Sequence, residues 1–170
     1  MVIVELTKSR IVGLGVFVVA LAVALFIVFD GPSDGRPDAD GVVEVVVEGF
    51  VFSPGQLTLP AGQPVTLVID NRNEFIHHLT VGRSAVEEDG RAVGFEEDLF
   101  AGVSVVADPP RAWLPPTPTV DTVTLNLPAR STVTYRFTLP EDRVGTWQIG
   151  CFVGRGCETR ISPEAEVRVE

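Results

Sequence analysis

From Val42 to the C-terminus, the chain consists of short segments in which apolar and polar residues alternate, each bounded by Pro or Gly. Examples are VVEVVVEGFVF, PVTLVIDN, STVTYRFTLP and AEVRVE. Alternation with a period of two places apolar side chains on one face of a β-strand. No segment beyond Val42 keeps a helical period. Strands at this spacing, with turn signals such as SPG between them, predict an all-β fold, an antiparallel sandwich or barrel.

A different pattern stands before this region. Residues 11–29, IVGLGVFVVALAVALFIVF, contain no charged residue, and a helix of this length spans about 28 Å, close to the hydrocarbon thickness of a bilayer. The following FDGPSDGRP offers no small-residue cleavage site, which favours a transmembrane anchor or uncleaved signal. Lys8 and Arg10 precede the segment, so residues 1–10 are expected in the cytoplasm and the remainder outside it.

The rest of the chain divides by composition. Residues 30–41, DGPSDGRPDADG, predict a flexible linker. Residues 42–170 form the predicted domain, interrupted at about 83–124 by a long acidic and Pro-rich insert. Within that insert, we expect one short helix around Phe95 to Ala101, followed by an extended Pro-rich segment at 107–119.

The net charge excludes some partners. The formal charge is −10, and the chain beyond Asp30 carries 11 Arg and no Lys against 21 Asp and Glu. Nucleic acids and anionic lipid surfaces are therefore not expected as partners. A cationic partner is compatible with this charge, as is a simple solvated surface. No nucleophile elbow, H-E-x-x-H or phosphate loop occurs, so we do not expect an enzyme.

Two segments carry residues that bind metals. The first, NRNEFIHHLTV, runs from Asn71 and contains His77 and His78, the only histidines. The second, VGTWQIGCFVGRGC, contains Cys151 and Cys157, the only cysteines. Because consecutive side chains of a strand point to opposite faces, His77 and His78 are expected on opposite sides of a sheet.

These segments resemble the cupredoxin family. GFVFSPGQLTLPAGQPVTLVIDNRNEF resembles the run before its first ligand His, and LPARSTVTYRFTLPEDRVGTWQIGC resembles the run to its ligand Cys. The resemblance implies a Greek-key β-sandwich with an extracytoplasmic copper site, in which His77 and Cys151 are ligands and Asn71 or Asn73 helps to fix the ligand loops. The family's downstream His is absent, and Gly156 and Cys157 occupy that region.

The axial Met of the family is absent too, because Met1 is the only methionine. A site built here would combine His77 with the Cys151 and Cys157 thiolates, and Glu158 or His78 as a fourth ligand. Soft thiolates favour Cu(I) or Zn(II). The alternative is a Cys151–Cys157 disulfide without metal, since five residues including two glycines separate the cysteines and exported pairs are usually oxidised.

Two functions follow. The first is a membrane-anchored, extracytoplasmic cupredoxin-like protein that binds copper for electron transfer or copper handling, with a redox partner. The second is a metal-free interaction module with the Cys151–Cys157 disulfide, docking an envelope protein, for example as an accessory subunit of an envelope or respiratory complex. The redox state of Cys151 and Cys157 discriminates between them.

Overall fold

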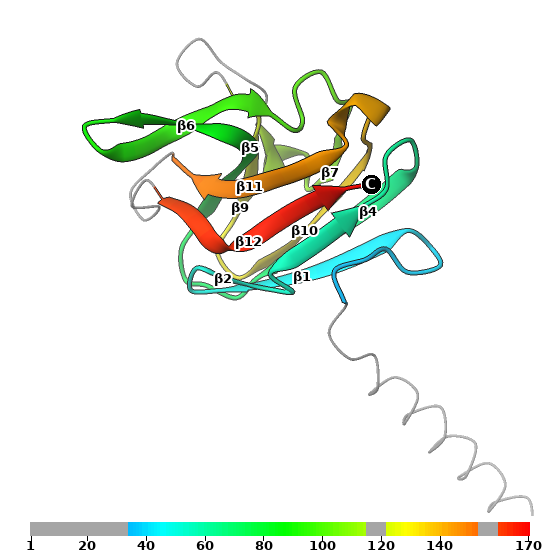
Figure 1. Cartoon of the computed structure of the whole chain (residues 1–170). Coiled ribbons are helices and arrows are strands. Elements are labelled where there is room, and N and C mark those ends of the chain that lie inside the picture. The colour runs from blue at the N-terminus through cyan, green and yellow to red at the C-terminus, as the bar shows by residue number, and fades with distance from the viewer. Residues whose placement is uncertain (1–33, 115–121, 153–159) are drawn as a thin grey trace, which may run out of the picture. The chain divides into compact units, whose positions relative to one another are not determined.

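The computed structural model describes residues 34–114, 122–152 and 160–170, and these form two β-sheets (Figure 1). The strands are β1 Val42–Glu48, β2 Val51–Ser53, β3 Gln56–Leu59, β4 Pro64–Asn71, β5 His77–Glu88, β6 Arg91–Asp98, β7 Val106–Asp108, β8 Trp113–Leu114, β9 Thr124–Leu127, β10 Ser131–Thr138, β11 Gly145–Cys151 and β12 Arg160–Val169. Two short 3₁₀ helices, Pro110–Ala112 and Glu141–Arg143, precede β8 and β11. The all-β fold predicted from the sequence is confirmed.

The sheets differ in size and in strand order. The five-stranded sheet has the order β2-β1-β4-β10-β7. The seven-stranded sheet has the order β3-β12-β11-β5-β9-β8, with β6 added to the second half of β5. Strands β5 and β11, which begin and end with the candidate ligands His77 and Cys151, are direct neighbours.

The alternation in the sequence forms the core. In β1, the side chains of Val43, Val45 and Val47 are buried, whereas the residues between them are partly or fully exposed. The same pattern continues in both sheets, and the buried residues form a single hydrophobic cluster. Every member of that cluster lies between residues 43 and 169, so the segment Pro32–Glu170, one of the two units of the chain, contains a complete core.

The pairing of the strands corrects one expectation. We expected an antiparallel sheet, but β1 pairs in parallel with β4 and β12 pairs in parallel with β3. Parallel neighbours need a crossover, which β2 and β3 provide between β1 and β4. Alternation of residues is the same in parallel and antiparallel strands, so the sequence pattern does not carry this information.

The region expected as an irregular insert begins as a regular hairpin. Strand β5 continues to Glu88 and turns back into β6, and this hairpin projects past the neighbouring strands (Figure 1). The short helix expected around Phe95 to Ala101 is wrong, because Phe95 lies within β6. The Phe95 side chain packs directly over Gly82, where a Cβ would come within 2.5 Å of it.

The N-terminal part of the chain lies mostly outside the described residues. Residues 1–33, including the apolar segment 11–29, are not described, and no helix among the described residues is long and apolar enough to cross a membrane. Of the expected linker 30–41, the part from Asp34 onward is described. The Thr58 amide donates a hydrogen bond to the Gly35 carbonyl (2.7 Å), so contact with the domain begins before β1.

Candidate functional site

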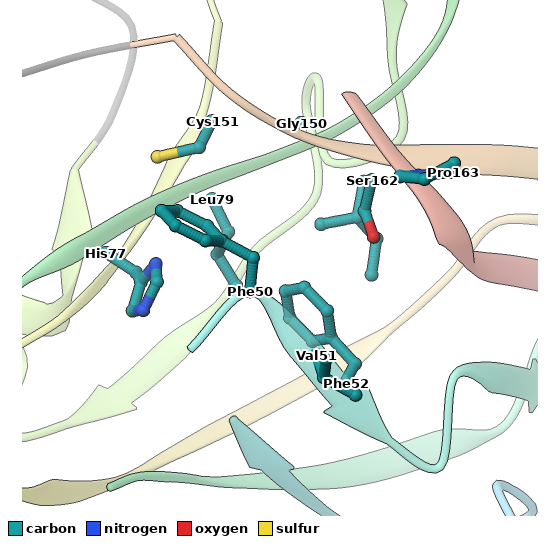
Figure 2. Close-up of a pocket in the computed structure, with 10 residues that line it drawn as sticks. Phe50, Val51, Phe52, His77, Leu79, Gly150, Cys151, Ser162 and Pro163 are labelled. Atoms are coloured by element: carbon teal, nitrogen blue, oxygen red, sulfur yellow. The ribbon is translucent and has the colours of Figure 1, made fainter. Parts of the chain in front are cut away.

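The fold brings His77 and Cys151 to one pocket. Cys151, the last residue of β11, pairs with Leu79 of β5. His77 lies two residues before Leu79, so its side chain is on the same face of the sheet. His77 is 1% exposed and Cys151 is 6% exposed. Both line a pocket of about 200 Å³ (Figure 2).

The remaining candidate ligands do not join them among the described residues. The side chain of His78 lies on the opposite face of β5 and is half-buried. In the strand register, His78 is the partner of Asn126 in β9. Cys157 and Glu158 lie outside the described residues. In the part of the chain that the structure describes, no group of three or more His, Cys, Asp or Glu side chains could hold a metal ion.

The sulfur of Cys151 is in a disulfide. No cysteine within the described residues is a free thiol. Cys157 is the only other cysteine in the sequence, and its own placement is not described. A metal ligand needs the thiolate form of cysteine, which a disulfide-bonded sulfur does not provide.

The pocket is mostly apolar. It lies between the β1–β2 turn with β2, the first residues of β5, the end of β11 and the first residues of β12 (Figure 2). Its polar side chains among the described residues are the His77 imidazole and the Ser162 hydroxyl. No Asp, Glu, Lys or Arg is among the described lining residues, which are Phe50, Val51, Phe52, His77, Leu79, Ile149, Gly150, Cys151, Ser162 and Pro163.

The imidazole of His77 is in contact with the Asn73 side chain and with two aromatic rings. Its Nε2 lies 2.9 Å from the Asn73 side-chain amide nitrogen. The Phe50 ring meets the imidazole edge-on at 5.6 Å and the Phe75 ring is tilted at 5.0 Å. Burial is the largest influence on the pKa of His77 and lowers it, against a backbone hydrogen bond with Gly49 that raises it. The ring is therefore neutral near pH 7, and it forms part of the pocket lining.

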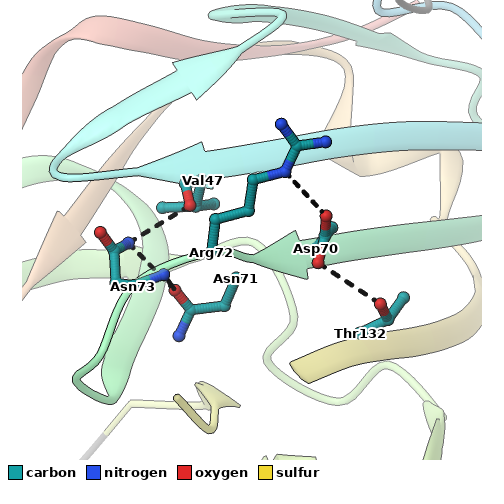
Figure 3. Close-up of polar contacts among 6 residues, drawn as sticks. All are labelled: Val47, Asp70, Asn71, Arg72, Asn73 and Thr132. Atoms are coloured by element: carbon teal, nitrogen blue, oxygen red, sulfur yellow. Dashed lines mark hydrogen bonds and ion pairs between the residues drawn. The ribbon is translucent and has the colours of Figure 1, made fainter. Parts of the chain in front are cut away.

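A pair of buried asparagines fixes the loop that carries His77 (Figure 3). The Asn71 amide group donates to the carbonyl oxygens of Phe75 (3.1 Å), Leu127 (3.1 Å) and Pro128 (2.9 Å). Asn71 Oδ1 accepts hydrogen bonds from the backbone and side-chain nitrogens of Asn73, both at 3.0 Å. The loop-fixing role that the family resemblance implied for these asparagines is what their hydrogen bonds provide.

Asn73 extends this network to the opposite wall of the pocket. Its Oδ1 accepts a hydrogen bond from the Gly49 amide (2.6 Å), and its Nδ2 is 3.2 Å from the Val47 carbonyl. Gly49 has a positive φ of 61°, a conformation that glycine adopts without strain. The turn that follows Gly49 positions Phe50, so Asn73 holds both His77 and the aromatic wall beside it.

Exposed apolar side chains lie at and beside the pocket: Phe50 and Val51 line it, the Phe75 ring contacts Phe50 and His77, and Ile76 precedes His77. Phe50, Val51, Phe75 and Ile76 are 36%, 58%, 39% and 43% exposed. We call these four residues the apolar collar. None of the four was predicted from the sequence to be a functional residue. The available signal was their position, because GFV and EFI place large apolar residues at turns, where polar residues are usual.

The residues present do not fit a blue copper centre. Such a centre needs two imidazoles and a thiolate with a weak axial ligand. The sequence contains two histidines, and His78 is on the wrong face of β5 to join His77. Cys151 supplies a disulfide sulfur in place of a thiolate. Of a blue copper ligand set, the described residues therefore supply one imidazole, that of His77, in an apolar pocket.

Comparisons with known proteins bear on the fold. No family model matches the sequence, and no curated protein matches it. Among solved structures, reduced auracyanin from the photosynthetic bacterium Roseiflexus castenholzii is 20% identical, with 78% of this chain and 99% of that chain covered and a TM-score of 0.45. Auracyanin A, a blue copper protein from Chloroflexus aurantiacus, is 18% identical, with 76% and 98% covered and a TM-score of 0.44.

A reduced amicyanin variant is a further match, 18% identical, with 82% of this chain and 92% of that chain covered and a TM-score of 0.40. These structural neighbours are cupredoxins, the family that the sequence resembles. Similarity of this size assigns no ligand, metal or partner to this protein.

Proposed function

We propose that this chain is a membrane-anchored, extracytoplasmic binding protein of cupredoxin-like fold, in which the pocket beside His77 docks a partner protein and holds no metal. The observation that carries the proposal is the exposed apolar collar beside the pocket; the apolar lining and the disulfide-bonded Cys151 support it. The partner is an envelope protein, with an assembly role such as that of an accessory subunit. No catalytic step is assigned to the chain.

The chemistry of the pocket supports docking. Large apolar side chains that remain exposed together are typical of surfaces that another molecule covers. The collar residues come from two separate segments, the β1–β2 turn and the β4–β5 loop, and both are tied down by Asn73. A surface that is held rigid before binding loses little conformational entropy when a partner covers it.

Copper handling is the second candidate, and a specific observation favours it. His77 and Cys151 line the same pocket. Reduction of the disulfide by a dithiol would give Cys151 a thiol, while the dithiol becomes a disulfide. The resulting nitrogen and sulfur donors would prefer Cu(I).

A copper titration separates the two candidates. The fragment Pro32–Glu170 is titrated with Cu(II), as isolated and after mild reduction, and visible absorption is recorded. Retention of Cu(I) against a chromogenic chelator is measured on the reduced sample. We expect no thiolate-to-copper band and no Cu(I) retention.

The two histidines provide a matched control. If copper were held at this site, His77→Gln and Cys151→Ser would abolish the signal, whereas His78→Gln, which changes the opposite face of the same strand, would leave it intact. That pattern would overturn the metal-free proposal and establish the copper candidate.

A further inference from the structure

The size of the pocket indicates the size of its occupant. An apolar cavity of about 150 Å³ is large enough to take benzene, and the pocket here has a volume of about 200 Å³. One aromatic group up to the size of a phenol or a fused indole therefore fits, and two separate aromatic side chains do not. The rings of Phe50 and Phe52 in the wall offer the edge-to-face contacts that aromatic pairs prefer.

The polar groups indicate the charge of that occupant. The described residues of the lining include no charged side chain to balance an ion, and burying an unpaired charge is unfavourable. Among these residues, the polar side chains that line the pocket are the His77 imidazole and the Ser162 hydroxyl. A neutral ring with a single polar group, such as an indole or a phenol, satisfies both conditions.

The charges beside the mouth indicate what accompanies the ring. A shallow depression continues from Val51 over Val46, Glu48, Ser53 and Arg72. Arg72 is paired with Asp70 at 3.1 Å, whereas Glu48 forms no ion pair with any described residue. On the other side of the collar, Glu74 is paired with Arg130. An exposed carboxylate beside the mouth therefore favours a cationic group next to the ring.

We propose that the pocket receives the side chain of a tryptophan or tyrosine from the partner protein, with a neighbouring Lys or Arg of the partner over Glu48. This inference rests on the docking function proposed above and names the chemistry of the partner. The collar favours a protein over a free small molecule, because the exposed faces of Val51, Phe75 and Ile76 extend beyond the area that one ring covers. The net charge of −10 is complementary to a basic segment.

The test is an NMR titration of ¹⁵N-labelled Pro32–Glu170. The probes are indole, phenol, benzoate, and the peptide acetyl-Gly-Lys-Trp-Gly-amide with matched peptides that carry Glu for Lys or Ala for Trp. We expect saturable shifts of the pocket amides, including Phe50, Leu79 and Ile149, with indole, phenol and the Lys-Trp peptide. Benzoate and the Ala peptide are expected to give none, and the Glu peptide is expected to bind more weakly than the Lys-Trp peptide.

Two exposed valines provide a matched pair of variants. Val51 is 58% exposed in the edge strand β2, and Val106 is 62% exposed in β7 at the other edge of the same sheet. Val51→Glu is expected to weaken indole and peptide binding about tenfold, since it places a charge at the mouth, and Val106→Glu is expected to change neither. Glu48→Gln is expected to weaken the peptide two- to fivefold, roughly what one exposed ion pair contributes, without affecting indole.

Each outcome decides a different part of the inference. Absence of pocket shifts with every probe, or equal effects of Val51→Glu and Val106→Glu, would overturn the aromatic-ring site. Binding of indole with no gain from the Lys-Trp peptide would overturn the protein partner and assign the pocket to a free small molecule. A copper–thiolate band in the separate titration would refute the metal-free function whatever these shifts show.

Discussion

Replacement of Asn71 by Ala is expected to destabilise the domain strongly. Asn71 is fully buried, and its amide group is shared among three backbone carbonyls while its Oδ1 accepts two hydrogen bonds from Asn73. The amide has two hydrogens, so two donated bonds and one accepted backbone bond are counted as independent. At about 1 kcal/mol for each, the loss is about 3 kcal/mol, a large part of the roughly 5–15 kcal/mol that stabilises a typical domain.

The assay is urea unfolding of Pro32–Glu170, followed by circular dichroism. With an m-value of about 1–3 kcal/mol per molar urea, the midpoint is expected to fall by about 1 M or more. Asn71→Asp, which keeps the volume but removes the donor, is expected to be at least as unstable, because a carboxylate would then face carbonyl oxygens.

Asn126→Ala removes the same atoms elsewhere and serves as the control. Asn126 donates one long bond of 3.4 Å to the Arg111 carbonyl, and its buried Oδ1 has no partner among the described residues. Its replacement is expected to change the free energy of unfolding by less than about 1 kcal/mol. If Asn71→Ala and Asn126→Ala unfold at the same urea concentration, the hydrogen bonds of Asn71 do not hold the site.

Three further predictions use the same unfolding assay. Gly82→Ala is expected to cost about 1–3 kcal/mol, because its Cβ would lie 2.5 Å from the Glu97 carbonyl oxygen. Gly94→Ala is the control and is expected to be neutral or stabilising, because a Cβ at Gly94 meets no atom within 4 Å. Equal urea midpoints for the two variants would contradict this. Tyr135→Phe is expected to cost about 1 kcal/mol, because the buried hydroxyl shares its one hydrogen between the carbonyl oxygens of Ala112 and Asn126, each 3.2 Å away. An unchanged midpoint would refute that role. Burial lowers the pKa of His77 below 6.5, so on acidification His77 takes up a proton in the unfolded chain before it does so in the folded chain. The free energy of unfolding should therefore fall as the pH drops from about 7 towards 5. His77→Gln should remove the part of this fall that His77 causes, and an identical pH profile would exclude His77 as its cause.

Much of the fold could be predicted locally. The alternation in VVEVVVE and STVTYRFT identifies strands and the face of each that is buried, because side-chain direction in a strand depends only on position. The same rule predicts opposite faces for His77 and His78, and in the structure His77 is the buried one. Side-chain alternation fails to identify the region of Phe95, Leu99 and Phe100, because the spacing of these residues resembles one turn of a helix. In the structure, Phe95 lies in strand β6 and packs over Gly82.

The candidate site was predicted in part. His77 and Cys151 were expected to meet, and they line one pocket. The contributions of Cys157 and Glu158 stay predictions, since both lie outside the described residues. The apolar collar was not predicted. A Phe in a turn does not by itself indicate an exposed apolar surface, because such a surface also depends on which other segment lies beside the turn.

The sequence by itself determined which segments are strands, which side chains share a face, and that the downstream histidine and the axial methionine of a blue copper set are missing. These are local properties or counts, and no tertiary contact changes them. Only the tertiary structure decided that β1 pairs in parallel with β4, that Asn73 joins the Gly49 turn to His77, and that Phe50 and Phe75 flank the same imidazole. These contacts join segments that are separate in the chain, and they depend on strand pairing, which side-chain alternation does not specify.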